Sequence, residues 1–296
     1  MQVLITGAAG GLGRAMAIEC ARRGYDLFLT DRNAAGLARI KAGLERQYGA
    51  AVAAQACDLT DSGSVDALLQ AIDARGLRFD LLLSIAGIDV EGGFLCRARE
   101  QLVGIVTLNV TATLRITHAI LERRRETSRF TAVLVSSLAS MFPMPLKATY
   151  AASKRFLLDF ATALRQEFKE QNAHVLVLCP GGMATNAEAA AAISAQGFWG
   201  DVTTNPLERV ARRTLDRALR GRSVYVPGLI NRALCLPVRL LVPWRRARPP
   251  SVLSAAAVRR ARGGRGVLRG AGASARPPPC RACRQNIMCS TKLSAK

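Results

Sequence analysis

The sequence lacks the features by which secreted and membrane-spanning proteins are recognised. No uninterrupted apolar run approaches the roughly 18 residues that a membrane helix needs. The first residues, Met1 to Ile5, carry no basic side chain, and their apolar run is cut off by Thr6-Gly7, so no signal peptide is expected. Together these absences favour a cytoplasmic protein.

Cysteine is present, but its spacing gives little support to disulfides or to a metal site. Five of the 8 cysteines lie far apart, mostly within apolar stretches, as buried reduced thiols do. Cys280 and Cys283 form a CxxC pair, but no second pair and no neighbouring histidine pair accompany it. A chance pair is the simpler interpretation, and no metal site is expected.

Acidic residues are absent from the last part of the chain. Between Trp244 and Lys296 lie 13 of the 42 Lys and Arg residues and none of the 21 Asp and Glu residues. The formal net charge of +21 therefore describes this segment more than the rest, where 29 basic residues face 21 acidic ones. From residue 245 onward Arg, Ala, Gly and Pro dominate without apolar periodicity, so we expect 245–296 to be a disordered basic tail.

Three accounts of this tail stay open. Its charge could bind acidic surfaces weakly, it could be an ordinary disordered extension, or its composition could be that of a GC-rich gene translated out of frame. Specific nucleic-acid binding is not expected, because aromatic residues that would stack on bases are not interleaved with the basic ones.

Strand-like and helix-like segments alternate from Met1 to about Ile230. Short apolar runs, typical of buried strands, lie at Val3–Thr6, Asp26–Thr30, Val52–Cys57, Leu81–Ser84, Ala132–Val135, Val175–Cys179 and Val224–Val226. Amphipathic patterns between them predict a helix that ends near Arg23 and helices over Ala34–Gln47, Ser64–Arg75, Glu100–Arg125, Thr149–Gln171 and Pro206–Arg220. This alternation predicts an α/β fold with a doubly wound, Rossmann-like parallel sheet in one domain over 1–230. A C-terminal amphipathic segment, 231–244, precedes the tail.

A glycine-rich turn joins the first expected strand to the first helix, and it reads Thr6-Gly7-Ala8-Ala9-Gly10-Gly11-Leu12-Gly13. Glycine at 7, 11 and 13 permits a tight turn and close approach of the backbone to a pyrophosphate. A helix that starts near this point directs its unpaired amides and its positive dipole end at that anion. The turn therefore predicts a dinucleotide site contacted by Thr6, Gly7, Gly11, Leu12 and Gly13. A merely flexible strand–helix connection is the alternative.

Two aspartates follow the second and third expected strands. Asp31 ends the second strand, where a carboxylate bonds the adenosine ribose hydroxyls and repels a 2′-phosphate, which favours NAD over NADP. Arg32 and Arg14 lie close by and could instead attract that phosphate, so NADP stays open. Asp58 is placed either to meet the adenine edge or to cap a helix.

A tyrosine and a lysine at positions i and i+4 form the expected catalytic group. Tyr150 and Lys154 lie on one face of a helix, one turn apart. A phenol with a pKa of about 10 is a poor acid–base catalyst at neutral pH, and a nearby ammonium lowers that pKa. Ser137 precedes them, at a strand end that borders the ligand crevice, so its hydroxyl can bond the same substrate oxygen. Ser136 is the alternative, and only the spacing to Tyr150 favours Ser137.

In combination, the TGxxxGxG loop, the spacing from Ser137 to Tyr150 and the YxxxK pair resemble the short-chain dehydrogenase/reductase family over about residues 2–230. The resemblance implies a nicotinamide-dependent oxidoreductase in which Tyr150 is the general acid/base. It also implies that Lys154 both lowers the pKa of Tyr150 and binds the nicotinamide ribose. In the same scheme Ser137 orients the substrate carbonyl.

The resemblance assigns two further groups. Asn109 would hold a water in a proton relay, although Asn109 alone could be a polar residue on a helix face. The sequence Pro180-Gly181-Gly182-Met183-Ala184-Thr185 resembles the family's PGxxxT segment, so Pro180, Gly181 and Thr185 are expected beside the nicotinamide.

One segment departs from the family pattern. Where the family has Asn-Asn-Ala-Gly after the fourth strand, Ser84–Gly87 reads Ser-Ile-Ala-Gly. Ala86 and Gly87 still permit close approach of the cofactor, but the missing amides remove side-chain hydrogen bonds between neighbouring strands, which predicts lower stability or turnover. This departure supports the alternative of a non-catalytic dinucleotide-binding regulatory protein. The intact catalytic set argues against that alternative.

Residues 186–205 lie where the family places its substrate lid. They carry few charges, only Glu188 and Asp201, which favours a small apolar ketone or secondary alcohol over a phosphorylated sugar. Family members pair through two long helices, here Glu100–Arg125 and Thr149–Gln171. A homodimer or homotetramer is therefore expected from the resemblance.

Overall fold

The computed structural model describes residues 1–185 and 204–241. The chain divides into two units, Met1–Val238 and Arg239–Lys296, and the fold that follows belongs to the first. The expected tail at 245–296, with its CxxC pair, and most of the expected lid lie outside the described residues.

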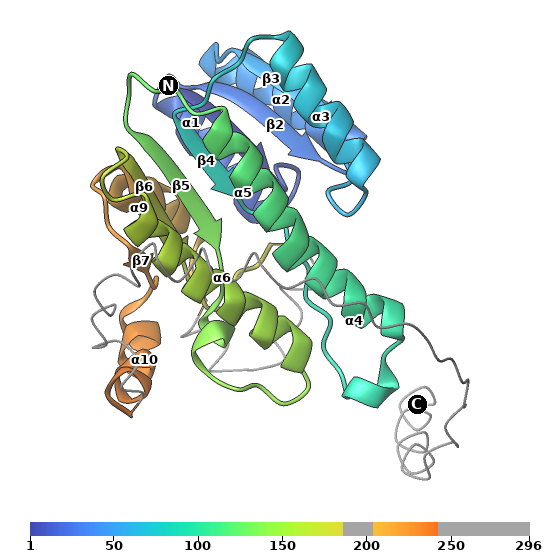
Figure 1. Cartoon of the computed structure of the whole chain (residues 1–296), viewed down its shortest axis with the longest axis vertical. Helices are drawn as coiled ribbons and strands as arrows, with labels where there is room; N and C mark the ends of the chain where they lie inside the picture. The colour runs from blue at the N-terminus through green and yellow to red at the C-terminus, as the bar shows by residue number, and fades with distance from the viewer. Residues whose placement is uncertain (186–203, 242–296) are drawn as a thin grey trace, which may run out of the picture. The chain divides into compact units, whose positions relative to one another are not determined.

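Seven parallel strands form one sheet in the order β3-β2-β1-β4-β5-β6-β7 (Figure 1). Their bounds are β1 (Gln2–Thr6), β2 (Asp26–Asp31), β3 (Val52–Ala56), β4 (Leu81–Ser84), β5 (Phe130–Val135), β6 (Ala173–Leu178) and β7 (Val224–Tyr225). The strand order reverses between β1 and β4, because β2 and β3 extend the sheet on one side and β4 to β7 on the other. The predicted doubly wound sheet is confirmed, and ligands bind at such a switch point.

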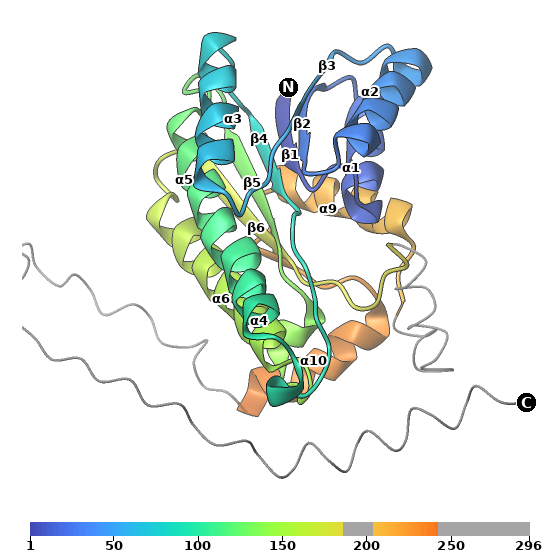
Figure 2. The same ribbon diagram turned by 90° about the vertical axis from the view of Figure 1, so that its right-hand side faces the viewer.

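Helices cover both faces of the sheet (Figure 2). One face carries α1 (Gly11–Arg22), α2 (Ala34–Tyr48) and α9 (Leu207–Leu219). The other carries α3 (Ser62–Ala74), α4 (Arg99–Val106), α5 (Thr113–Glu122) and α6 (Ala148–Glu167). Two short 3₁₀ turns, η1 (Phe94–Cys96) and η3 (Leu138–Met141), follow β4 and β5, and α10 (Leu229–Leu241) follows β7. The amphipathic segment expected from residue 231 thus begins two residues earlier, as a helix.

Each face of the sheet has its own apolar core. Because successive strand residues point to opposite faces, Leu4 of β1 packs beneath α3, α5 and α6, whereas Val3 and Ile5 pack beneath α1, α2 and α9. The inner strands β4 and β5 are buried along their whole length. Burial on both faces explains why their sequences are continuous apolar runs.

The longest helical segment carries a local irregularity. One regular helix is expected over Glu100–Arg125, but the helical segment Arg99–Glu122 contains a π-helical turn, η2 (Thr107–Ala112), between α4 and α5. By length and apolar composition alone the segment could cross a membrane, but Ile116 and Ile120 pack in the core beside the sheet, as in a core helix. Since π turns often mark functional positions, the place of Asn109 within η2 directs attention to that residue.

Candidate active site

The glycine-rich turn leaves no room for side chains. Gly7 has a φ of 66°, and a Cβ there would lie 2.8 Å from the backbone nitrogen of Ala86. A Cβ at Gly11 would lie 2.6 Å from the carbonyl oxygen of Thr185. Helix α1 begins at Gly11, and its N-cap Gly10 supplies no side-chain hydrogen bond. The first amides of α1 can therefore bind an anion, and the turn fits the pyrophosphate of a dinucleotide.

Asp31 ends β2 beside this turn. Its carboxylate accepts the amide of Ala9 and the amide of Asn33, each at 2.9 Å, so it ties the glycine-rich turn to the start of α2. Asp58 uses its carboxylate within its own loop. It accepts the hydroxyl of Thr60 at 2.6 Å and the Thr60 amide at 2.9 Å, and these bonds lower the pKa of Asp58. The side-chain cap of α3 comes from a different aspartate.

The hydroxyl of Thr6 joins β1 to β4 where the family's amide side chains are missing. Thr6 Oγ1 accepts the amide of Ile85 at 3.0 Å and the amide of Ala86 at 3.3 Å. The Thr6 side chain is fully buried, so these bonds are shielded from water. A tie between the two strands therefore persists at the switch point despite the Ser-Ile-Ala-Gly sequence.

Gly87 gives two site side chains room beside the backbone. A Cβ there would lie 2.9 Å from Oδ1 of Asn109 and 3.1 Å from Nζ of Lys154. Asn109 is fully buried, and its Oδ1 accepts the amide of Ile88 at 2.9 Å. Its Nδ2 donates to the carbonyl oxygen of Ile88 and to Oγ of Ser153, both at 3.0 Å. The Asn109 side chain thus holds the loop after β4 against α6, and the water-binding role implied by the resemblance stays a prediction.

Ser137 and Tyr150 meet at the end of β5. Ser137 precedes η3, and its hydroxyl oxygen accepts the amide of Ala139 at 3.1 Å. The Ser137 side chain also lies close enough to the phenol of Tyr150 to lower the pKa of that phenol. Ser136 is placed differently, because its buried hydroxyl donates to the backbone oxygen of Lys154 at 2.6 Å and so holds α6 against β5. The structure brings together Ser137, the serine favoured by spacing, and Tyr150.

Lys154 is a buried ammonium. Its Nζ donates to the carbonyl oxygen of Val135 at 3.0 Å and lies 5.7 Å from the centre of the Tyr150 ring. Burial lowers the pKa of Lys154 to about 8, although the charges of Asp89 and Cys179 act in the opposite direction. With a pKa so close to neutrality, this group can respond to charge that develops on a neighbour.

The pKa of Tyr150 is raised rather than lowered. Burial of the phenol is the largest cause of the raised pKa. The nearby Ser137 side chain opposes it, the charge of Asp89 adds to it, and the charge of Lys147 opposes it. Lys154 is not among these causes, so its lowering of the Tyr150 pKa stays a prediction. In this geometry Lys154 bonds the main chain, and the lysine that lowers the pKa is Lys147. Tyr150 is a neutral phenol at neutral pH.

The sequence analysis missed an ion-pair group beside Tyr150. Nζ of Lys147 lies 2.6 Å from a carboxylate oxygen of Asp89, 3.1 Å from one of Glu91 and 5.9 Å from the centre of the Tyr150 ring. Burial alone would lower the pKa of Lys147, but the two carboxylates outweigh it and raise the pKa. The available signal was a pair of alternating acids after the Ser-Ile-Ala-Gly segment and a lysine shortly before the tyrosine, but neither belongs to a known motif.

The segment from Pro180 to Thr185 borders both halves of the site. The carbonyl oxygen of Pro180 accepts the amide of Leu138 at 2.7 Å, which joins the segment to the turn that carries Ser137. At the other end, the backbone of Thr185 lies against Gly11 of the glycine-rich turn. The segment therefore connects the catalytic group to the dinucleotide loop, and its contact with a nicotinamide stays a prediction.

One family of known proteins matches most of the sheet domain. The family model described as short chain dehydrogenase matches residues 1–195. The structure is similar to that of a short-chain dehydrogenase from Sphingobium yanoikuyae in complex with NADPH, with a TM-score of 0.70, 27% identity and coverage of 85% of this chain and 98% of that one. It is also similar to a 3-oxoacyl-[acyl-carrier protein] reductase with bound NAD from Brucella melitensis, with a TM-score of 0.66, 28% identity and coverage of 77% and 89%.

Two curated relatives cover a smaller part of the chain. A very-long-chain 3-oxoacyl-CoA reductase of Laccaria bicolor is 32% identical over 174 residues, which is 57% of this chain and 51% of that protein. The 17-beta-hydroxysteroid dehydrogenase type 3 of Homo sapiens is 28% identical over 184 residues, 62% of this chain and 59% of that protein. The chain thus spans little more than half the length of these relatives.

Proposed function

This chain belongs to the short-chain dehydrogenase family of oxidoreductases, and from that premise we propose that it interconverts an apolar ketone and the corresponding secondary alcohol by hydride transfer. The observation that carries the proposal is the approach of the Ser137 side chain to the phenol of Tyr150, with the buried ammonium of Lys154 5.7 Å from the centre of the Tyr150 ring. A protein that only binds a dinucleotide has no need of this phenol, so a regulatory role without catalysis is not favoured.

The proton chemistry follows from the state of Tyr150. Because burial raises its pKa, the phenol is protonated at neutral pH and can donate to a carbonyl oxygen as that oxygen gains negative charge. Ser137, whose side chain approaches the same phenol, orients the substrate oxygen toward it. Lys154 stabilises the phenolate left after the transfer. In the oxidative direction the phenolate accepts the alcohol proton.

A nicotinamide dinucleotide would supply or accept the hydride when bound. We propose that the amides at the start of α1 hold its pyrophosphate and that Lys154 holds its nicotinamide ribose. Asp31 favours NAD, because a carboxylate at the end of β2 would repel a 2′-phosphate. NADP stays a candidate, since the similar enzyme from Sphingobium yanoikuyae was solved with NADPH.

Apolar surface beside the site supports an apolar substrate. Phe94, Leu95 and Leu146 are 63%, 75% and 57% exposed. They lie in the loops that follow β4 and precede α6, which a bond from the amide of Gly92 to the carbonyl oxygen of Leu146 joins. Exposed apolar side chains grouped beside a catalytic residue commonly form a ligand-binding surface. The curated relatives are likewise named for 3-oxoacyl and hydroxysteroid compounds, in which an oxo or hydroxyl group is attached to an apolar chain or ring system.

The substrate proposal is tested with a panel of apolar ketones and secondary alcohols. Turnover is followed at the nicotinamide absorbance with NADH, NADPH and their oxidised forms. Tyr150→Phe gives the background rate, because it removes only the hydroxyl. Turnover of apolar ketones well above that background supports the proposal. A parent protein that binds a dinucleotide but turns over no member of the panel contradicts it.

Cofactor preference is tested at Asp31. Removing its charge in Asp31→Asn should raise the NADPH-to-NADH ratio of kcat/KM by about tenfold or more, because a nearby like charge costs a phosphate about 1–4 kcal/mol. The matched variant Asp31→Ala also removes the acceptor for the amides of Ala9 and Asn33. A shift in the Ala variant alone would trace the preference to loop geometry, and a parent that already prefers NADPH widely would contradict the assignment.

We also propose that copies of this chain associate through α4 and α6. Val103 and Val106 of α4 are 56% and 42% exposed, and Phe156 of α6 is 39% exposed. Burying them between two copies would remove this apolar surface from water. Light scattering after size-exclusion chromatography should give a dimer or tetramer, and V103D should shift it to the monomer. A monomeric parent would contradict the proposal.

A further inference from the structure

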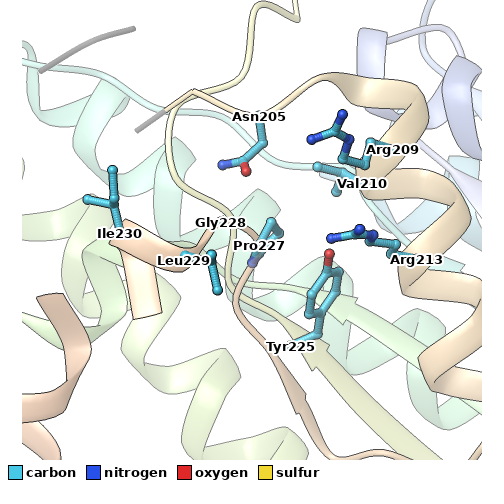
Figure 3. Close-up of a pocket in the computed structure, with 9 residues that line it drawn as sticks. All are labelled: Asn205, Arg209, Val210, Arg213, Tyr225, Pro227, Gly228, Leu229 and Ile230. Carbon is cyan, nitrogen blue, oxygen red and sulfur yellow. The ribbon is translucent and has the colours of Figure 1, made fainter. Parts of the chain in front are cut away.

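A cavity of about 380 Å³ lies at the C-terminal end of β7 (Figure 3). The start of α9, the end of β7 and the first turn of α10 line it. Its volume is that of a small-molecule pocket. In the sheet, β6 separates β7 from β5, where Ser137 and Tyr150 meet. The cavity therefore lies at the carboxyl ends of the strands, as the catalytic group does, but at β7 rather than at β5.

Two arginines of α9 bring positive charge to this cavity. Arg209 and Arg213 lie one helical turn apart, and both line the cavity. Across residues 1–185 and 204–241, no carboxylate lies within ion-pair distance of either one. Of the two acids of α9, Glu208 forms no ion pair with any described residue, and Asp216 pairs with Arg23 at 2.8 Å. Within the part of the chain that the structure describes, the two guanidinium groups therefore have no carboxylate partner and can bind an anionic ligand.

A buried tyrosine adds a hydroxyl to the same cavity. Tyr225 is 2% exposed, and in Figure 3 its phenol oxygen points into the cavity, toward the region reached by Arg213. Two further guanidinium groups flank its ring, that of Arg217 at 4.7 Å from the ring centre and that of Arg232 at 5.9 Å. Four arginines thus line the cavity or flank the Tyr225 ring, an arrangement that raises the local potential and attracts anions.

The main chain contributes donors as well. Helix α10 begins at Leu229, directly after Gly228 with its φ of 82°, and both Leu229 and Ile230 line the cavity. Amides in the first turn of a helix have no intrahelical partner, and the helix dipole makes this end positive. Guanidinium forks, a phenol and helix amides around one cavity are the groups that bind phosphate oxygens in proteins.

We propose that this cavity binds a phosphate or diphosphate group. Its source is either the carrier of a thioester substrate, such as coenzyme A, or a free phosphorylated metabolite. The first source rests on the proposed function, because it would anchor the carrier while the acyl ketone reaches Tyr150. The anion site itself is independent of any turnover, so the two are tested separately.

Calorimetric titration of the full chain with inorganic pyrophosphate and with coenzyme A tests the anion site. The R209Q/R213Q double variant should weaken binding of both by about tenfold or more, the loss expected when charge-assisted bonds to phosphate are removed. Tyr225→Phe keeps the packing and should weaken binding by a smaller factor. Arg220→Gln is the matched control, since Arg220 follows α9 and is exposed but does not line the cavity. Binding that is absent in the parent, equal in the double variant, or equally lost in the control overturns the site.

Kinetics then identify the source of the phosphate. The same 3-oxoacyl group is offered on coenzyme A and on N-acetylcysteamine, which carries no phosphate. If the carrier is the source, the double variant should lower kcat/KM about tenfold for the coenzyme A thioester and leave the other unchanged. If pyrophosphate binding is lost while both thioesters are unaffected, the ligand is a free phosphorylated metabolite. A parent that reduces neither thioester counts against the proposed function, and the titration still decides the anion site.

Discussion

Two lysines flank Tyr150, with Nζ of Lys154 at 5.7 Å and Nζ of Lys147 at 5.9 Å from the centre of its ring. Their surroundings nevertheless shift their pKa values in opposite directions. Lys154 is buried and bonds a main-chain carbonyl, and burial lowers its pKa to about 8. Lys147 is half-buried between Asp89 and Glu91, whose charges outweigh the effect of burial and raise its pKa. The pKa of a lysine beside Tyr150 is therefore set by whether burial or neighbouring carboxylates have the larger effect.

The difference separates a responsive charge from a fixed one. Lys154 titrates close to neutral pH, so it can stabilise charge that appears on Tyr150 during proton transfer. Lys147 stays charged, and its pair with Asp89 joins the loop after β4 to the loop before α6. The amide of Gly92 and the carbonyl oxygen of Leu146 join the same loops at 2.8 Å. Lys154 therefore takes part in the proton transfer, and Lys147 holds together the two loops beside the site.

Removing the phenol between the two lysines should have the largest effect. Tyr150→Phe deletes the proton donor and leaves the ring packing in place. We expect kcat to fall by about 10² to 10⁴, the usual contribution of general acid–base catalysis. Cofactor affinity, measured by titration, should stay nearly unchanged. Activity within tenfold of the parent would contradict the catalytic assignment.

Lys154→Met should abolish turnover but stabilise the fold. The pKa of Lys154 is about 8 in the folded protein against 10.5 for a free lysine, so the folded state holds this proton less tightly. Below pH 8 the buried ammonium therefore costs up to about 3 kcal/mol of unfolding free energy. That cost declines as the pH rises from about 8 toward 10.5, where the unfolded state also loses the proton.

Denaturant unfolding of the parent and of Lys154→Met over this pH range measures the difference. The variant should be the more stable protein at pH 7, and its advantage should shrink steadily above pH 8. A difference that does not change with pH would show that packing, rather than the buried charge, separates the two proteins. A less stable variant at pH 7 would mean that the bond to Val135 outweighs the burial of charge.

The region around Lys154 was largely predictable from the sequence. Tyr150, Lys154 and Ser137 follow a fixed spacing, and the parallel sheet follows from the alternation of apolar runs and amphipathic segments. The glycine-rich turn is predictable for a similar reason, because a side chain at its glycines would collide with atoms a few residues away or after the neighbouring strand. Such features depend on distances along the chain, which a sequence displays directly.

The region around Lys147 was not predictable in the same way. Asp89 and Lys147 are 58 residues apart, and only the packing of two loops brings them together. The π turn at Thr107–Ala112 has no compositional signal, so the buried bonds of Asn109 to Ile88 were not expected. The direction of the Tyr150 pKa shift also escaped prediction, because burial, which spacing does not show, is its largest cause.

A change at Asp89 should have a smaller effect, visible in the pH profile. The charge of Asp89 raises the pKa of both Tyr150 and Lys154, so Asp89→Asn should lower both. Ketone reduction requires the protonated phenol, and the alkaline limb of kcat/KM should therefore move to lower pH. Glu91→Gln is the matched control, since Glu91 contacts Lys147 but is not among the charges that act on Tyr150. Equal shifts in both variants would trace the effect to a loosened Lys147.

The smallest expected effect concerns the backbone beside Lys147. Leu146 has a φ of 66°, a left-handed conformation that costs an L-residue about 1–2 kcal/mol, and its side chain is exposed. Leu146→Gly removes that strain, while the greater freedom of glycine in the unfolded chain offsets about 0.5–1 kcal/mol of the gain. We expect a net stabilisation of up to about 1 kcal/mol, seen as a rise in Tm of about 2–4 °C for a domain of this size.

Leu146→Ala is the control for this last change, because it removes the exposed side chain but keeps the penalty of a left-handed residue. The Ala variant should leave Tm unchanged or lower it slightly. If both variants raise Tm equally, the gain comes from removing apolar surface, and the backbone is not strained. If Gly alone raises Tm, the ties from Gly92 to Leu146 and from Asp89 to Lys147 hold this loop in a conformation it would not otherwise adopt. Lys147 would then be held beside Tyr150 by a strained turn, whereas Lys154 lies in a regular helix, α6.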